Sequence, residues 1–169
     1  MEAMDAPYTV SVVCLGNICR SPMAEVMIAG ALKQAGLSQV AVESAGTSDW
    51  NEGSGADPRA GDVVARAELD LSGHVARQFA PEDFNRVDLI LAMDSSNLRE
   101  LRALAPSQEG AAKVRLLRSF DPAARAGGDL EVVDPFFGDP GDFDTTFEHI
   151  SAALPGIVEF VRAEVAARA

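Results

Sequence analysis

The chain has 169 residues, of which 47% are hydrophobic and 24% charged, as expected for a globular domain large enough to bury a core. Its formal net charge of −12 opposes the binding of phosphate chains, so no nucleic-acid partner is expected. No apolar stretch approaches the roughly 20 residues that span a bilayer, and the residues before Thr9 lack the basic and apolar segments of a signal peptide. No membrane partner is therefore expected, and the expected compartment is the cytoplasm, with export without a signal peptide left open.

The hydrophobic pattern predicts strands that alternate with helices. Four strands are expected, at 8–13, 39–44, 87–93 and 113–117. Four helices are expected, from Ser21 to a cap at Gly36, over 57–70, over 95–105 and over 143–167, with Pro155-Gly156 kinking or interrupting the last. This order predicts an α/β fold in which one parallel sheet is covered by helices on both faces. Ligands bind beyond the carboxyl ends of the strands in such folds, so residues 14–21, which follow the first strand, are the first candidate site.

One segment, 119–142, shows little hydrophobic periodicity and holds three Asp-Pro pairs and four glycines. A loop of this length in a compact domain is usually functional or disordered. The adjacent Phe136 and Phe137 argue against disorder, because paired phenylalanines need a surface that covers them.

The stretch "CLGNICRS" (14–21) has the residue types of an anion-binding loop that leads from a strand into a helix. The backbone N–H groups of such a loop, together with those of the first helical turn, form a cup for an anion. Gly16 permits the backbone angles that the cup requires, and Arg20 can bind two phosphate oxygens with its planar guanidinium. The same dipoles favour the thiolate form of Cys14, which is then placed for in-line attack on phosphorus. Ser21 could donate its hydroxyl to this sulfur.

Other interpretations of the two cysteines rest on the same residues. A cysteine at the end of an apolar strand is often a small core residue, and a Cys-x5-Arg spacing alone is weak evidence. A metal site is not expected, because the two histidines, His74 and His149, are distant in the sequence. A reversible disulfide between Cys14 and Cys19, which would protect the thiols or be the activity itself, stays open.

The stretch "VCLGNICRSPMAE" (13–25) closely resembles the active-site loop of the low-molecular-weight protein tyrosine phosphatases of the bacterial type. In the family's order and over almost the whole chain, the resemblance continues through "SAGTSDW" (44–50), "ADPRA" (56–60), "HVARQF" (74–79), "ILAMDSSNLR" (90–99), "LLRSFDP" (116–122) and "DPFFG" (134–138). It implies a single phosphatase domain over 1–169, with its core at about 8–168. It also implies a Rossmann-like (flavodoxin-like) fold with a four-stranded parallel sheet and flanking helices, in agreement with the predicted elements.

The resemblance implies hydrolysis of phosphotyrosine and small aryl phosphates through a phosphocysteine intermediate, with no metal and no other cofactor. Cys14 is the implied nucleophile. Arg20 and the loop amides from Leu15 onward would stabilise the charge on the phosphoryl oxygens. The phosphate-binding residues implied are Leu15, Gly16, Asn17, Ile18, Cys19 and Ser21.

Asp134 is implied as the acid that protonates the departing phenol and later deprotonates water. Its apolar neighbours, among them Val132 and Phe136, are expected to favour the neutral carboxylic acid, and Pro135 to stiffen the backbone. Without the resemblance, an Asp-Pro pair would more often be assigned to the start of a turn.

A polar network is also implied to support the loop, formed by Asn17, Ser21, Ser44 and His74, with Asp94 nearby. Asn17 is expected at positive φ, where asparagine is tolerated and its side chain can bond buried neighbours.

Aromatic and aliphatic side chains are implied as the walls of a deep slot, which a phenyl phosphate fills and a phosphoserine does not. These are Leu15, Ile18, Trp50 and Phe136. Phe136 and Phe137 stand where many members of the family carry tyrosines, so phosphorylation there cannot regulate this protein. Asn51 lies at a rim position that varies in the family.

Three alternatives remain beside this interpretation. Arsenate reductases share the fold and loop but need further cysteines downstream, and none follows Cys19. Protein arginine phosphatases typically place threonine where Ile18 stands, and an apolar residue there favours an aryl ring. A non-catalytic phosphopeptide-binding module would lack the nucleophile or the acid. The expected partners are phosphotyrosine-containing proteins and a cognate tyrosine kinase. We also predict that Cys14 and Cys19 can pair under oxidation, because a tight loop lets their sulfurs approach.

Overall fold

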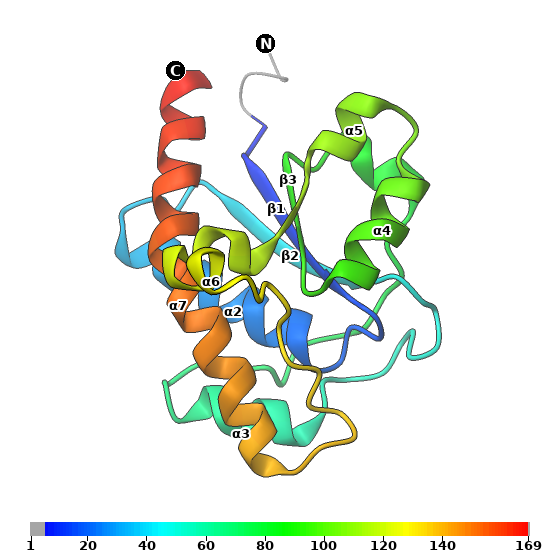
Figure 1. The fold of residues 1–169 in the computed structure, drawn as a ribbon, viewed down its shortest axis with the longest axis vertical. Coiled ribbons are helices and arrows are strands. Elements are labelled where there is room, and N and C mark those ends of the chain that lie inside the picture. The colour runs from blue at the N-terminus through cyan, green and yellow to red at the C-terminus, as the bar shows by residue number, and fades with distance from the viewer. Residues whose placement is uncertain (1–5, 169) are drawn as a thin grey trace.

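The computed structural model describes residues 6–168, and its centre is a sheet of four parallel strands in the order β2-β1-β3-β4 (Figure 1). The strands are β1 (Thr9–Cys14), β2 (Ala41–Gly46), β3 (Leu89–Ala92) and β4 (Val114–Leu116). All of β1 is buried, and its register pairs Cys14 with Gly46 of β2 and Val13 with Ala92 of β3. The predicted parallel sheet is confirmed, with each strand within about two residues of its expected place.

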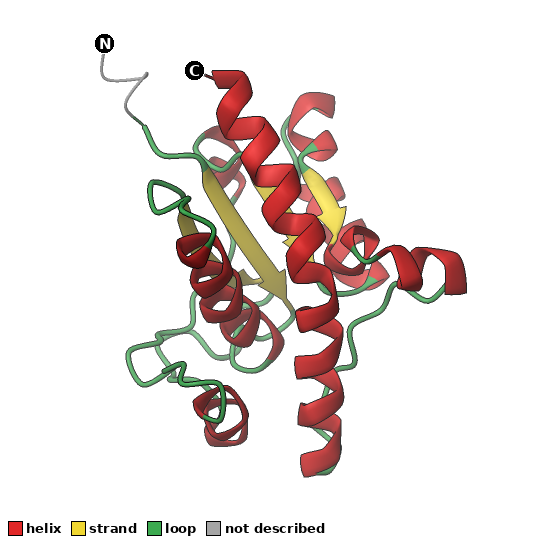
Figure 2. Cartoon of the chain, turned by 90° about the vertical axis from the view of Figure 1, so that its left-hand side faces the viewer, coloured by secondary structure: helices red, strands yellow, loops and turns green. Residues whose placement is uncertain are grey.

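Helices cover both faces of the sheet, as the alternation predicted. One face carries α2 (Arg20–Gln34), α3 (Pro58–Ala65) and α7 (Pro140–Arg168), which contact one another. The other carries α4 (Ser95–Leu104), α5 (Gln108–Ala112) and the 3-10 helix η1 (Pro81–Asn85). Successive β1 side chains divide between two hydrophobic clusters, with Val10 and Val12 on the α2 side and Val13 on the α4 side. Figure 2 shows α7, the helix that ends at C, in front of the strands.

The C-terminal helix α7 is continuous from Pro140 to Arg168, so the predicted interruption at Pro155-Gly156 is wrong. A proline inside a helix removes one backbone donor, and here the apolar stripe of the same helix packs against the core on both sides of it. Gly156 allows a close approach, because a Cβ there would clash with the carbonyl oxygen of Phe120. No helix among residues 6–168 is long and apolar enough to cross a membrane.

The helix expected over 57–70 is shorter, since α3 ends at Ala65. Glu68 takes a left-handed φ of 64°, and the Leu69 N–H donates to the Val64 carbonyl at 3.1 Å. This closure ends the helix and turns Leu69 back against the core cluster.

The segment 119–142 is not one long loop. It contains the end of the 3-10 helix η2 (Leu117–Phe120), the short helix α6 (Pro122–Gly127) and the start of α7. Asp121 caps α6 by accepting from the Ala123 N–H at 3.0 Å, and Gly128 ends it with a left-handed φ of 82°. An Asp-Pro pair therefore starts a helix here that was too short to show a hydrophobic period.

Candidate active site

The loop of residues 15–19 leads from β1 into α2. Asn17 has a left-handed φ of 58°, as predicted, but Gly16 has no positive φ, so the backbone role predicted for this glycine is wrong. A Cβ on Gly16 would lie 2.6 Å from Nδ2 at the end of the Asn51 side chain, so Asn51 would have to shift. Gly46 gives the loop room on its other side, since a Cβ on Gly46 would lie 2.7 Å from the Leu15 carbonyl oxygen.

The buried Cys14 sulfur receives two polar contacts. The Asn17 N–H donates to Sγ at 3.3 Å, and Ser21 Oγ lies 3.0 Å from it. Asn17 Nδ2 also donates to Ser21 Oγ at 2.8 Å. Because an amide nitrogen only donates, the Ser21 hydroxyl accepts from it, and its own hydrogen can go to the Cys14 sulfur or to the Ala45 carbonyl oxygen at 3.4 Å. This arrangement stabilises negative charge on Cys14.

Asn17 anchors the loop through all of its polar groups. Its Nδ2 donates to Ser44 Oγ at 3.0 Å, and Ser44 Oγ donates to Glu25 Oε1 at 2.6 Å. Its Oδ1 accepts from the Arg77 N–H at 3.0 Å, and its carbonyl oxygen lies 2.7 Å from His74 Nε2. The structure thus brings together Ser44 and His74 with Asn17, and adds Glu25 and Arg77 to the network.

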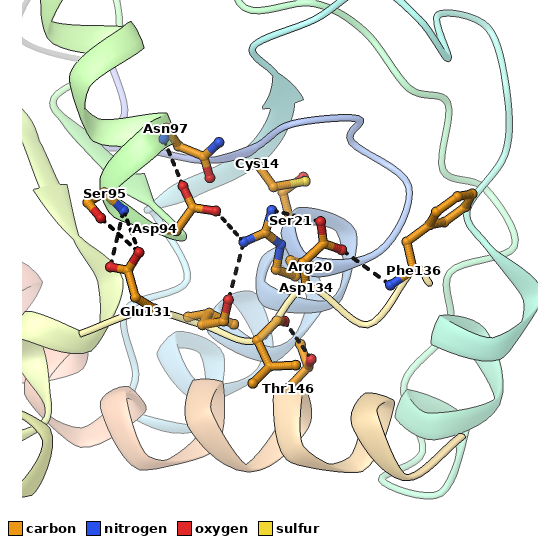
Figure 3. Close-up of polar contacts among 12 residues, drawn as sticks. Cys14, Arg20, Ser21, Asp94, Ser95, Asn97, Glu131, Asp134, Phe136 and Thr146 are labelled. Atoms are coloured by element: carbon orange, nitrogen blue, oxygen red, sulfur yellow. Dashed lines mark hydrogen bonds and ion pairs between the residues drawn. The ribbon is translucent and has the colours of Figure 1, made fainter. Parts of the chain in front are cut away.

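Arg20 is buried, and acidic groups hold its guanidinium from two sides (Figure 3). Nη1 donates to Asp94 Oδ2 at 2.8 Å and to the Val132 carbonyl at 3.2 Å, while Nη2 lies 3.5 Å from Asp134 Oδ2. Burial by itself would lower the pKa of Arg20, but the Cys14 sulfur and the carboxylates of Asp94 and Asp134 raise it above its ordinary value. Arg20 therefore stays cationic and oriented.

Asp134 lies beside Arg20 on a segment that α7 holds in place. The Thr146 hydroxyl lies 2.8 Å from the Val133 carbonyl oxygen and 3.0 Å from the Asp142 carbonyl oxygen, and can donate to either. The Val133 N–H donates to His149 Nδ1 at 3.4 Å. The Asp134 side chain is 47% exposed, so the apolar enclosure expected from its sequence neighbours is wrong. Val132 points into the core, and the carboxyl group faces the cleft with Oδ1 accepting from the Phe136 N–H at 3.2 Å.

Apolar side chains surround this group of polar residues and form the walls of a pocket. The pocket is lined by Cys14, Leu15, Gly16, Ile18, Cys19, Arg20, Trp50, Asn51, Asp134, Phe136 and Phe137. Trp50 is 75% exposed and Phe137 is 95% exposed, so the cleft presents aromatic rings to solvent at its mouth. Arg59 steadies the wall by donating to the Phe136 carbonyl at 3.1 Å while pairing with Asp57. The structure therefore places all four predicted wall residues around Cys14.

Comparisons with known proteins agree with the family resemblance over almost the whole chain. The sequence model of the low molecular weight phosphotyrosine protein phosphatases matches residues 9–167. The chain belongs to this family. A low molecular weight protein-tyrosine-phosphatase of Streptomyces coelicolor is 50% identical over 163 residues, which cover 96% of this chain and 98% of that protein. The low molecular weight protein-tyrosine phosphatase A of Mycobacterium tuberculosis is 46% identical over 159 residues, or 94% of each chain.

The fold agrees with the family as well. The crystal structure of a protein tyrosine phosphatase from Entamoeba histolytica, with Hepes in its active site, superimposes with a TM-score of 0.86 and 28% identity. The match covers 93% of this chain and 98% of that one. The predicted membership of the low-molecular-weight phosphatases is confirmed, and the arsenate reductase and arginine phosphatase alternatives are not favoured.

The second thiol of this family member lies in a different setting from the first. Cys19 is buried, and its Sγ donates to Asp57 Oδ2 at 3.8 Å. Burial, and then the negative charge of Asp57, raise the pKa of the Cys19 thiol above its ordinary value. Cys19 is thus held as a neutral thiol, and both cysteines are free. Their pairing under oxidation stays a prediction.

Four residues at the phosphatase site were not expected from the sequence: Glu25, Arg77, Thr146 and His149. Glu25 could have been inferred, because it lies one turn after Ser21 in α2, at the end of the stretch that carries the resemblance. Thr146 and His149 reach the site from α7 and Arg77 from the loop before η1, so no spacing along the chain predicts them. Among residues 6–168, no group of three or more His, Cys, Asp or Glu side chains is arranged to hold a metal ion.

Replacing Thr146 by valine is expected to lower the kcat of this phosphatase about fivefold for aryl phosphates with poor leaving groups. The change keeps the shape of the buried side chain but leaves the Val133 carbonyl without its donor, which costs about 1 kcal/mol and loosens Asp134. Steady-state kinetics with a series of substituted phenyl phosphates would measure it.

The adjacent Thr145 provides the control, because among the described residues its hydroxyl donates to the Gly141 carbonyl one turn back in α7 and not to the segment of Asp134. Thr145→Val should leave the rates unchanged. An equal loss in both variants, or a loss that does not depend on the leaving group, would contradict a positioning role for Thr146.

Proposed function

We propose that this protein hydrolyses phosphotyrosine in proteins, and small aryl phosphates, through a phosphocysteine intermediate. One observation supports this proposal most strongly. The Cys14 sulfur, stabilised by the Asn17 N–H and the Ser21 hydroxyl, shares one cleft with the Arg20 guanidinium and the Asp134 carboxyl group. These are the nucleophile, the charge-stabilising group and the acid that the reaction requires.

The first half-reaction transfers the phosphoryl group to sulfur. The Cys14 thiolate attacks phosphorus, the bond from phosphorus to the tyrosine oxygen breaks, and Asp134 donates its proton to that oxygen. Arg20 and the backbone N–H groups of the loop neutralise charge on the three remaining phosphoryl oxygens. The dephosphorylated tyrosine side chain leaves with its protein, and Cys14 carries the phosphoryl group.

The second half-reaction releases phosphate. The Asp134 carboxylate takes a proton from a water molecule, the water oxygen bonds to phosphorus, and the sulfur–phosphorus bond breaks. The Ser21 hydroxyl, 3.0 Å from Sγ, stabilises the thiolate as it leaves. Phosphate departs, and Cys14 and Asp134 return to their starting protonation states.

The walls of the cleft support an aryl substrate. Leu15, Ile18, Trp50 and Phe136 surround the approach to Cys14 and give it an apolar lining. A phenyl ring fills such a slot, and its length carries the phosphate down to the sulfur, whereas phosphoserine is too short. Ile18 offers the guanidinium of phosphoarginine no polar partner.

This chemistry predicts both a partner kinase and a cellular compartment for the enzyme. A tyrosine kinase must form the phosphoproteins that the enzyme consumes, so a cognate kinase belongs to the proposal. The nucleophile must stay a reduced thiol, which favours the cytoplasm over an oxidising compartment.

Phosphate release from three matched peptides tests the proposal. The peptides carry phosphotyrosine, phosphoserine or phosphoarginine in one sequence, and the assay contains a metal chelator. Release from phosphotyrosine is expected, with little from the other two. Preference for phosphoarginine would overturn the role given to Ile18 and the aromatic walls. No release from any peptide would overturn the proposed hydrolysis.

A further inference from the structure

A second depression adjoins the active-site cleft. It runs between the segment 47–52, the segment 78–81 and α4, and its lining residues are Leu15, Thr47, Ser48, Trp50, Glu52, Gln78, Phe79, Ala80, Pro81, Glu100, Leu101 and Leu104. Leu15 and Trp50 also line the cleft above Cys14, so the two hollows share one wall. We call this second depression the side groove. A peptide that places a side chain in the cleft can run across that shared wall into the second hollow.

The side groove has an apolar floor and an acidic rim. Phe79 and Leu101 are buried beneath it, and Leu104 is 38% exposed at its edge. Its charged lining residues are Glu52 and Glu100, both exposed, and no lysine or arginine lines it.

Neither glutamate of the side groove is neutralised by a base within the described part of the chain. Among residues 6–168, no ion pair includes Glu52 or Glu100. Within the part of the chain that the structure describes, Glu52 Oε2 accepts from the Gln78 backbone N–H at 3.2 Å and from no other group. The nearby Arg102 is turned elsewhere, because its Nη2 donates to the Val114 carbonyl at 2.9 Å. The two carboxylates are therefore available to a ligand.

We propose that the side groove binds the residues of the substrate that flank the phosphotyrosine, and that it selects a lysine or arginine next to an apolar side chain. The inference rests on the proposed function and adds a sequence preference to it. An extended peptide advances roughly 3.3 Å per residue, so the positions within about three residues of the phosphotyrosine can reach past Trp50. The long stems of lysine and arginine pack on apolar surface while their charged ends meet carboxylates. An acidic flanking segment would be repelled.

Kinetics with peptides of one length and one phosphotyrosine test the preference. Each peptide carries one of three pairs: Leu-Lys, Leu-Gln or Leu-Glu. The pair is placed on the N-terminal side of the phosphotyrosine in one set of peptides and on its C-terminal side in another. The two exposed ion pairs are expected to raise kcat/KM about tenfold for a Leu-Lys peptide over its Leu-Gln counterpart, chiefly through KM. The preference should shrink as salt is added.

Two variants distinguish an effect of the side groove from an effect of the protein's overall charge. The double variant Glu52→Gln, Glu100→Gln should lose the preference for Leu-Lys peptides. Glu109→Gln, which removes the same kind of charge from α5 outside the side groove, should keep it. Equal kcat/KM for all peptides, or a preference that survives the double variant, would overturn the inference.

Two further readouts keep this inference distinct from the proposed function. Hydrolysis of phenyl phosphate, which is too small to reach the side groove, measures the chemistry alone and should be equal in the double variant and the parent. Binding to Cys14→Ser, followed by the fluorescence of Trp50, needs no turnover, and Trp50 is the single tryptophan of the chain. Tighter binding of Leu-Lys peptides there would support the side groove even if hydrolysis failed, and equal binding of all peptides would refute it.

Discussion

Replacing Cys14 by serine is expected to lower kcat for phosphotyrosine peptides by about 10⁴-fold or more, because the step that forms the phosphocysteine is lost. A serine hydroxyl in the same place is a weaker nucleophile toward phosphorus than a cysteine sulfur. The Asn17 N–H, the Ser21 hydroxyl and Arg20 would remain to bind phosphate, so the variant should still bind phosphopeptides. Phosphate release and mass spectrometry of acid-quenched enzyme would measure the two effects.

Cys19→Ser is the matched control, since Cys19 also lines the cleft but its thiol donates to Asp57, whereas Asn17 and Ser21 contact the Cys14 sulfur. It should retain turnover within about tenfold and should still form a phosphoenzyme in the quench experiment. A phosphoryl group found on Cys19, or a phosphoenzyme in Cys14→Ser, would contradict the assignment of the nucleophile.

Replacing Asp134 by asparagine is expected to lower kcat by about 10²- to 10⁴-fold for phenyl phosphate, because the departing phenoxide then receives no proton. The loss should be smaller for nitrophenyl phosphate, whose leaving group needs less help. Steady-state kinetics over a series of substituted phenyl phosphates would reveal it as a steeper dependence of kcat on the pKa of the phenol.

Asp139→Asn provides the comparison, because Asp139 also precedes a proline in the same segment but does not line the cleft. It should leave the leaving-group dependence unchanged. If Asp134→Asn kept the parent dependence, or if Asp139→Asn altered it, the acid would have to be assigned elsewhere.

The structure supports the roles of Cys14 and Asp134 through different kinds of contact. The Cys14 assignment rests on contacts within one loop, whereas Asp134 reaches the cleft through packing between distant elements. Arg20 connects the two, since it donates to the Val132 carbonyl and lies 3.5 Å from Asp134. Asp94, which also caps α4 through the Asn97 N–H at 2.8 Å, holds the other side of the guanidinium. Asp94, at the N-terminus of α4, therefore helps to orient Arg20, which lies at the N-terminus of α2.

Several features of the site could be predicted from local sequence, and others could not. The left-handed conformation of Asn17 was predictable because the conformation depends on a residue and its immediate neighbours. The backbone role predicted for Gly16 is wrong, because its φ is not positive. The short helix α6 was missed because its six residues are too few to show a hydrophobic period.

The sequence by itself determined the alternation of strands and helices, and with it the parallel sheet and the place of the loop from Cys14 to Ser21 at the end of β1. These follow from interactions between residues that are close along the chain, so their pattern is visible there. Only the tertiary structure decided which distant groups meet that loop, among them Asp94 on Arg20 and Thr146 behind Asp134. It also decided that the side groove joins the cleft at Trp50. Such contacts depend on how whole elements pack, and no spacing along the chain records which side chains that packing brings together.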